Sequence, residues 1–368
     1  ILVLAAGEPD FDTPINIRQA AVKAMDDGLT RYVPGKGTPA LQEAIIKKFR
    51  IENNIVYSND EIIVGVGGKH ILYNAMMATL NPGDEVIVPA PFWVSYPDII
   101  LLAEGKPVIV PCGEKQGFKI TPTQLEQNIT SKTKWLMLNS PCNPTGAVYS
   151  KQELLALSEV LIKNSHVNIL TDDIYEKIIY DDKIFYTLAS IVPELKKRTL
   201  TLNGVSKAYC MTGWRLGYCG GPKEIIAGMN KIQSQSNTST SSITMAASVE
   251  ALEGNQDFID LHNIEFKRRR NIVVEKLNAI NGITCSIPQG AFYVYPSCAG
   301  ILGKKTPSGD VVDTDEKFMT YLLESQGVAG VHGEAFGLSP YFRLSFATSE
   351  KILLDACERI AKACRNLK

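Results

Sequence analysis

Short apolar runs alternate with helix-like segments between residues 62 and 220, and this alternation constrains the fold more than any other feature of the chain. Runs such as 135–138 and 199–202 have the length of buried strands, whereas 69–80 and 151–163 carry helical patterns. The other elements predicted in this region are strands at 61–64, 85–89, 167–170 and 216–219 and a helix at 94–102. Because strands that alternate with helices usually pair in parallel, the pattern predicts an α/β fold with a mainly parallel, helix-covered sheet.

The last third of the chain has a different pattern. A long polar-rich helix is predicted over 257–279, and a closing helix over 349–366. The strands predicted between these helices are 283–287, 291–295, 327–332 and 342–346. A chain of 368 residues exceeds the size at which one hydrophobic core usually suffices. We therefore predict a large domain at 30–280 and a smaller α/β domain made of 1–29 and 281–368.

The charge balance argues against several classes of partner. The formal net charge is −1, so the chain lacks the basic footprint that nucleic acids require. Hydrophobic residues make up 45% of the sequence, as in ordinary globular proteins. No apolar run approaches the ~20 residues of a membrane span. The prediction is a small-molecule partner, without nucleic acid or membrane.

The cysteines and histidines do not predict a cross-linked or metal-bound protein. The eight cysteines are scattered without a Cys-x-x-Cys pair, and the four histidines lack the spacing of metal ligands. Neither a disulfide framework nor a metal site is therefore expected. Scattered cysteines in apolar stretches are typical of reduced thiols, which favours a cytoplasmic location.

Reactive side chains follow three of the predicted strands. Lys207 comes after 199–202, while Asp172 and Tyr175 follow 167–170, and Asn143 follows the strand that ends at Leu138. Loops at the carboxyl ends of parallel strands form the ligand-binding crevice of open α/β sheets, so these groups are expected in one site. A poorly solvated lysine has a lowered pKa, and its neutral amine can attack an aldehyde. Alone, such a lysine is more often a solvated surface charge.

A glycine-rich turn offers a place for an anion. Gly67, Gly68 and Lys69 join a predicted strand to a predicted helix. The first backbone N–H groups of a helix have no partner inside the helix and lie at its positive end. The turn therefore predicts a phosphate or carboxylate site close to the strand-end residues.

Together these motifs resemble the class I pyridoxal-phosphate aminotransferases of fold type I. The resemblance covers nearly the whole chain, from Gly7-Glu8-Pro9-Asp10-Phe11 to the segment 341–348. It is closest to the bacterial branch of aspartate aminotransferases, some of whose members also accept prephenate. The stretches that carry this branch's style are 32–37, 67–69 and 211–215. The resemblance implies a large cofactor-binding domain with a mainly parallel sheet and a smaller α/β domain.

The resemblance also implies catalytic roles around pyridoxal 5'-phosphate. Lys207 corresponds to the lysine that holds the cofactor as a Schiff base and then shuttles a proton as general acid/base. Asp172 corresponds to the carboxylate that keeps the pyridine nitrogen protonated, which leaves Asp173 outside this role. Tyr175 and Asn143 match the residues that hold the phenolate oxygen; outside this setting, a buried Tyr or an Asn-Pro turn is often structural.

The phosphate and the ring have matching residues as well. Residues 67–69 and Arg215 correspond to the phosphate site, and Tyr32 matches a tyrosine that comes from the partner subunit. A homodimer with shared active sites is therefore expected. Trp93 matches the aromatic residue that stacks on the cofactor ring beside the substrate. The serine often found three residues before the lysine is Gly204 here, and Ser206 could replace it.

Substrate recognition follows the same resemblance. Arg343 corresponds to the arginine that binds the α-carboxylate, with Gly7 and Asn143 beside it. Many relatives bind the distal carboxylate through a partner-subunit arginine, but 229–236 offers only a lysine as a cation. The branch that lacks this arginine uses the lysine at the position of Lys69.

The predicted reaction is transfer of the amino group from L-aspartate to 2-oxoglutarate, which gives oxaloacetate and L-glutamate. Three alternatives stay open at this point. The first is a bifunctional aspartate/prephenate aminotransferase. The second is a pyridoxal-phosphate lyase or decarboxylase, since the same scaffold supports these reactions. The third is a binding protein that retains the cofactor fold, which the intact Lys207 argues against.

Overall fold

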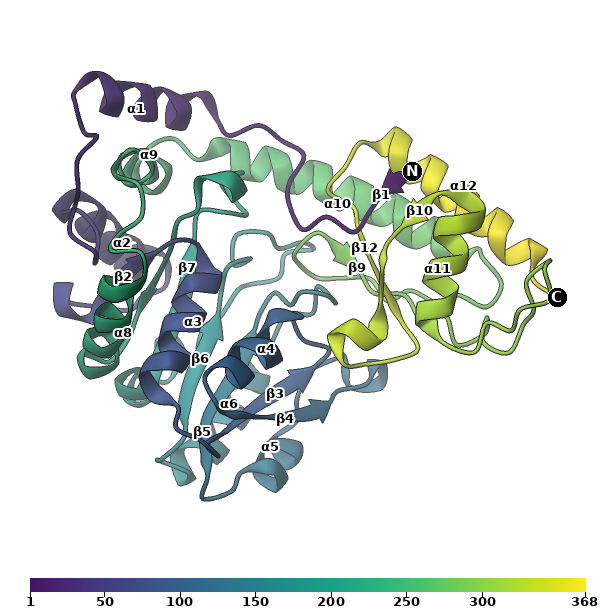
Figure 1. The fold of residues 1–368 in the computed structure, drawn as a ribbon, viewed down its shortest axis with the longest axis horizontal. Helices are drawn as coiled ribbons and strands as arrows, with labels where there is room; N and C mark the ends of the chain where they lie inside the picture. Colours follow the sequence, from purple (N-terminus) through teal and green to yellow (C-terminus); the bar gives the residue numbers. More distant parts are fainter.

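A seven-stranded sheet forms the centre of the computed structural model, which describes residues 1–368 (Figure 1). Its strand order is β2-β8-β7-β6-β5-β3-β4. The strands are β2 (Ile62–Gly65), β3 (Glu85–Ala90), β4 (Lys106–Pro111), β5 (Thr133–Asn139), β6 (Asn168–Asp172), β7 (Thr199–Gly204) and β8 (Gly217–Gly220). Only β8 runs antiparallel to its neighbours, β2 and β7. The predicted α/β fold with a mainly parallel sheet is confirmed.

Helices cover both faces of this sheet, and the strands carry apolar side chains on both faces. Along β5, Trp135 and Met137 belong to the apolar cluster shared with α3 (Gly68–Thr79), α4 (Ser95–Leu102) and α8 (Lys223–Ser236). The alternate residues Leu136 and Leu138 belong to the cluster shared with α5 (Pro122–Asn128), α6 (Lys151–Lys163) and α7 (Leu188–Ile191). Side chains of a strand point alternately to its two faces, so one strand supplies both cores.

A smaller group of elements lies beside the main sheet (Figure 1). Strand β1 (Leu2–Val3) pairs with β10 (Val328–Ala329) in parallel, and an antiparallel sheet joins β11 (Val331–His332), β12 (Phe342–Ser345) and β9 (Tyr293–Val294). Two helices, α11 (Asp315–Gln326) and α12 (Glu350–Asn366), complete this group. The long helix α10 (Asp257–Asn278) runs from the vicinity of α9 toward α12 and so connects the two parts.

The N-terminal segment crosses from the smaller group to the larger one. After β1 the chain reaches α1 (Ile15–Asp26), which lies far from β1 and packs against α9 (Ser242–Glu253) (Figure 1). In this contact, Asn16 donates a hydrogen bond of 2.8 Å to Glu250. Helix α2 (Pro39–Glu52) follows and also contacts α9. The division into domains at residues 30 and 280 stays a prediction.

The structure corrects the secondary-structure prediction at two places and adds a strand at a third. Residues 327–332 were expected to form one strand but form two, β10 and β11, which belong to different sheets. Residues 283–287 were expected to form a strand, but the segment makes only an isolated bridge, Thr284 with Ser297. Pro288 follows directly, and its missing N–H limits further pairing. Strand β4 was not predicted; it is an edge strand with prolines at both ends, which weakens its apolar pattern. All eight cysteines are buried and unpaired.

None of the helices combines the length and the apolar composition that a membrane crossing requires.

Candidate active site

A cavity of about 490 Å³ opens at the carboxyl ends of β5, β6 and β7. Its wall also includes the start of α3, the segment before α4, the N-terminal segment, and residues of β9 and β12. Ten of the twelve predicted site residues line it: Gly7, Gly68, Lys69, Trp93, Asn143, Asp172, Tyr175, Lys207, Arg215 and Arg343. The expectation that the strand-end residues meet in one site is therefore supported by the geometry.

Lys207 lies in the turn that follows β7. Its Nζ donates a hydrogen bond to the carbonyl oxygen of Gly7, which fixes the N-terminal segment at the cavity wall. Removal from water and, second, the positive charge of Arg343 together lower the pKa of Lys207 from 10.5 to about 8. The amine is therefore easier to deprotonate than that of an ordinary lysine, as a nucleophile and proton carrier requires.

Asp172 ends β6 and is a buried carboxylate without an ion-pair partner. Its side chain is 5% exposed, and no lysine, arginine or histidine lies within ion-pair distance. Burial raises the pKa of Asp172, and a hydrogen bond from Tyr96 lowers it; burial dominates, and the pKa is about 6. The Tyr96 hydroxyl donates to Oδ2 at 2.6 Å, and the backbone N–H of Ile174 reaches Oδ1 at 3.4 Å. The carboxylate thus retains acceptor capacity for a cationic ligand.

Arg343, on β12, is the opposite case, a buried cation without a carboxylate partner. One guanidinium nitrogen donates to Asn143 Oδ1 at 2.9 Å and another to the Ala5 carbonyl at 2.7 Å. Its Nε has no hydrogen-bond partner. The guanidinium carbon lies 4.6 Å from the ring centre of Tyr293 and 5.0 Å from that of Phe336. A buried guanidinium is costly unless an anion pairs with it, so this position suits a ligand carboxylate.

Tyr175 and Asn143 line the same cavity as these two charges. The Tyr175 hydroxyl is 2.9 Å from that of Tyr293, and burial together with this neighbour raises the pKa of Tyr175 well above its usual value. Asn143 is held in place because its backbone N–H donates to Asn139 at 2.8 Å. Its Oδ1 is used by Arg343, which leaves the amide nitrogen available as a donor.

The glycine-rich turn lies against Arg215, as the anion-site prediction requires. Gly67 has a φ of +81° at the N-terminus of α3, and a Cβ atom there would lie 2.5 Å from a guanidinium nitrogen of Arg215. Only glycine allows this approach. Gly67 itself is not part of the cavity wall, but Gly68, Lys69 and Arg215 are. The Lys69 Nζ lies 4.9 Å above the ring of Trp93, which brings an ammonium group and an aromatic face together.

Tyr32 is the other predicted residue that does not line the cavity. Its side chain is 96% exposed, far more than is usual for a tyrosine. Ser206 does line the cavity, whereas Gly204 does not. The proposed substitution of Ser206 for the missing serine is therefore compatible with the geometry.

Sequence reasoning missed two tyrosines of the site, Tyr96 and Tyr293. For Tyr96 a signal was present, because it lies three residues after Trp93 at the start of a predicted helix, where i and i+3 side chains share a face. Tyr293 gave no such signal. It lies on a two-residue strand in a run of aromatic residues that reads as core.

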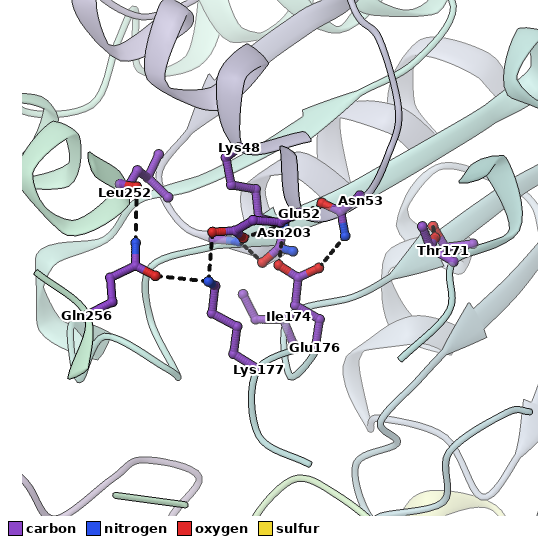
Figure 2. A network of polar contacts seen from close by, with 12 residues as sticks. Lys48, Glu52, Asn53, Thr171, Ile174, Glu176, Lys177, Asn203, Leu252 and Gln256 are labelled. Atoms are coloured by element: carbon purple, nitrogen blue, oxygen red, sulfur yellow. Dashed lines mark hydrogen bonds and ion pairs between the residues drawn. The ribbon is translucent and has the colours of Figure 1, made fainter. Parts of the chain in front are cut away.

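A second polar cluster includes Glu176 and Lys177, on the segment that follows Asp172, and lies away from the cavity. This rear cluster, drawn in Figure 2, consists of Lys48, Glu52, Asn53, Glu176, Lys177 and Gln256. Lys48 of α2, whose side chain is 1% exposed, forms an ion pair with Glu176 and donates to Asn53 at 2.7 Å. Asn53 in turn donates to Glu176 at 2.7 Å, and Lys177 pairs with Glu52 at 2.8 Å. No member of the cluster lines the cavity.

Comparison with known proteins identifies the family of the chain. The model of the family described as aminotransferase class I and II matches residues 1–360. An aspartate aminotransferase of Rhizobium meliloti is 54% identical over all of this chain and 90% of its own length. An aspartate/prephenate aminotransferase of Cereibacter sphaeroides is also 54% identical, over all of this chain and 92% of its own length.

Solved structures give the same answer for the fold. The crystal structure of the aspartate aminotransferase from Rhizobium meliloti superposes with a TM-score of 0.98 at 54% identity, covering 100% of this chain and 92% of that one. The Thermus thermophilus enzyme with maleate gives a TM-score of 0.92 at 40% identity, with 99% and 91% covered. Family, full-length identity and fold therefore agree: the chain belongs to the class I and II aminotransferases and is a transaminase.

Proposed function

We propose that this transaminase is an aspartate aminotransferase, which uses pyridoxal 5'-phosphate to transfer the amino group of L-aspartate to 2-oxoglutarate. One observation carries the proposal. The cavity holds a buried anion, Asp172, and a buried cation, Arg343, and neither has an ion-pair partner in the protein. Lys207, an amine whose pKa is lowered to about 8, lines the same cavity.

The residues of the cavity fit pyridoxal phosphate. Asp172 is the partner that a protonated pyridine nitrogen needs, and Arg215 with the start of α3 provides charge and N–H donors for a phosphate. Trp93 offers an aromatic face, while Tyr175 and Asn143 offer donors for a phenolate oxygen. When bound, this group supplies an aldehyde carbon for an amine and a cationic ring that withdraws electrons.

Three side chains of the cavity would move the proton, orient the substrate and hold the ring nitrogen. Lys207 would hold the group through its amine, and as a free neutral amine it would be the base and acid that moves the proton at the substrate Cα. Arg343 binds the α-carboxylate through its planar fork and so orients the Cα–H bond. Asp172, as an anion, keeps the ring cationic while negative charge develops.

The distal carboxylate of the substrate is assigned to Lys69. Its ammonium group lies at the cavity wall beside Trp93, and the site contains no other unpaired lysine besides Lys207. The proteins named above as relatives act on aspartate by name, and one was solved with maleate, a dicarboxylate. Both support a dicarboxylate as the substrate of this chain.

We further propose a homodimer with shared active sites and a cytoplasmic location. The almost fully exposed ring of Tyr32, which does not reach the cavity of its own chain, supports a role at the phosphate of a partner subunit. Eight free thiols are compatible with a reducing compartment. Sedimentation of a fully active monomer would contradict the dimer.

The substrate proposal is tested with a panel of amino donors against 2-oxoglutarate, oxaloacetate and prephenate. Aspartate is expected to be the best donor. Lys69→Ala should lower kcat/KM for aspartate relative to phenylalanine by roughly ten- to a hundredfold, since a charged hydrogen bond contributes about 1.5–3 kcal/mol. Lys163→Ala at the end of α6, outside the cavity, is the matched control and should leave the ratio unchanged. An unchanged ratio in Lys69→Ala at saturating cofactor would contradict the assignment.

Activity with prephenate is a second candidate, favoured by the names of relatives at 54% identity. The same panel separates it from strict aspartate use. A lyase or decarboxylase would be recognised by its products, because only a transaminase gives oxaloacetate and glutamate in equal amounts. Borohydride reduction followed by peptide mapping should find the cofactor on Lys207; another lysine would overturn the central assignment.

A further inference from the structure

Tyr96 makes a direct contact with the carboxylate of Asp172. The phenol lies at the start of α4, is 3% exposed, and donates to Asp172 Oδ2 at 2.6 Å. This is the only side-chain hydrogen bond that Asp172 receives, and Tyr96 makes no other side-chain hydrogen bond. The short bond from a hydroxyl to an ionised acceptor is of the stronger, charge-assisted kind.

The segment that carries Tyr96 is fixed from two sides. The Trp93 ring packs edge-on against the Tyr96 ring, with centres 5.6 Å apart and planes at 89°. One residue earlier, the backbone N–H of Phe92 donates to the Phe336 carbonyl at 3.0 Å. Phe336 also packs against the Arg343 guanidinium. The phenol is therefore held in a defined orientation, with its hydroxyl directed at one oxygen of Asp172.

We propose that Tyr96 is a positioning residue that holds Asp172 in its ionised form through Oδ2. Oδ1, which accepts only the 3.4 Å contact from the Ile174 backbone N–H, then retains acceptor capacity for the ring nitrogen of the cofactor. The inference rests on the proposed function, because it assigns a partner to the residue that would bind the pyridine. A buried carboxylate without water tends to take up a proton. The Tyr96 hydroxyl replaces one of the lost water contacts, and so it stabilises the anion without introducing a competing positive charge.

The direction of the effect follows from this arrangement. Asp172 and the ring nitrogen would share one proton, and the hydrogen bond from Tyr96 makes the carboxylate the weaker base of the two. Loss of the hydroxyl makes Asp172 more basic, so the shared proton moves toward the carboxylate. The ring is then less cationic and withdraws electrons less well. A residue that served only in packing would not move this proton.

The test is Tyr96→Phe in holoenzyme loaded with pyridoxal phosphate labelled with nitrogen-15 in the ring. The ring-nitrogen chemical shift reports where the proton lies, independently of turnover. We expect a shift toward the unprotonated pyridine value and a fall in kcat of roughly ten- to a hundredfold, the equivalent of one charged hydrogen bond. KM for aspartate should change less than kcat, because the substrate carboxylates bind elsewhere.

Tyr57→Phe is the matched control. Tyr57 is equally buried, and its hydroxyl is 3.0 Å from that of Thr201, but it does not line the cavity. This variant should keep the wild-type chemical shift and kcat. In an Asp172→Asn background, Tyr96→Phe should cause no further loss, because the group on which it acts is gone.

Three results would overturn the inference: an unchanged ring-nitrogen shift in Tyr96→Phe, equal losses in Tyr57→Phe, or additive losses in the Asp172→Asn background. If Tyr96→Phe does not fold, 3-fluorotyrosine at position 96 carries the test. Its more acidic hydroxyl should move the signal the other way, toward the protonated ring, and no movement would refute the role. If wild-type protein binds no cofactor at Lys207, the proposed function fails first, and the role of Tyr96 fails with it.

Discussion

The cavity and the rear cluster use the same kinds of side chain in opposite ways. Both have charged groups on the segment that runs from Asp172 to Lys177, and both contain a lysine removed from water. In the rear cluster, Lys48 and Glu176 pair with each other, and Asn53 donates to the carboxylate (Figure 2). In the cavity, Asp172, Lys207 and Arg343 have hydrogen-bond partners but no ion-pair partner.

The pKa values reflect this difference. Burial alone would raise the pKa of Glu176, but Lys48 and the hydrogen bond from Asn53 outweigh it and lower the value. For Asp172 the balance is reversed, and burial raises its pKa to about 6. A buried charge is compatible with a stable fold when an opposite charge and hydrogen bonds pair with it. An unpaired buried charge costs free energy, which a bound ligand of opposite charge can offset. The unpaired charges therefore indicate the ligand-binding cavity, whereas the paired charges of the rear cluster stabilise the structure behind it.

The largest expected effect separates the two lysines by activity. Lys207→Ala should lower kcat by at least the roughly 10²- to 10⁴-fold that a general acid/base contributes, with cofactor saturating. The free energy of unfolding of this variant without cofactor should not fall, because the substitution also removes the cost of burying the amine. Steady-state kinetics and urea unfolding measure both quantities. Near wild-type turnover in Lys207→Ala would contradict the prediction that the lysine of the cavity acts in catalysis.

The second effect separates the lysines by stability. Lys48→Met leaves Glu176 buried without its cation, which should lower the free energy of unfolding by about 3–5 kcal/mol. The double variant with Glu176→Leu should recover part of this loss. Lys47→Ala is the control, because Lys47 pairs with Glu253 at 2.8 Å on the surface, where such pairs contribute at most about 1 kcal/mol. Urea unfolding that finds the two single variants equal would contradict the role of the cluster.

The sequence predicted the cavity better than its support. Lys207, Asp172 and Asn143 could be placed together because each follows a parallel strand. The carboxyl ends of such strands lie at one edge of the sheet. Arg343 could be assigned through the family resemblance alone. Its neighbours Ala5 and Asn143 lie 338 and 200 residues away in the chain, and no local pattern predicts such contacts.

The rear cluster could not be predicted for the same reason. Lys48 has the pattern of an ordinary helix lysine, and its burial depends on how α2 packs against the segment after β6. The short strands of the smaller part were equally difficult to place. Residues 283–287 have the apolar alternation of a strand, but pairing depends on partners distant in sequence, and these offer a single bridge.

A third, smaller effect compares the two adjacent acids. Asp173 is 2% exposed, one of its oxygens lacks a partner, and burial together with Glu176 raises its pKa well above the usual value. Asp173→Asn mimics the neutral acid and should leave kcat close to wild type. Asp172→Asn removes the anion that faces the cavity and should lower kcat by about 10²-fold, as for loss of one preorganised electrostatic group. Equal losses at saturating cofactor would contradict this assignment.

The smallest effect concerns the pH dependence of Lys207 in the protein without cofactor. Its pKa is lowered from 10.5 to about 8, first by removal from water and then by Arg343. Between these two values the unfolded chain binds more protons than the folded one, so this group makes stability rise with pH across that window. Reaction of Lys207 with an amine reagent should accordingly show a midpoint near pH 8. Arg343→Gln should raise the midpoint, because a nearby positive charge is removed. A midpoint equal to that of exposed lysines would show that Lys207 is as well solvated as they are, and the contrast between the cavity and the surface would then be lost.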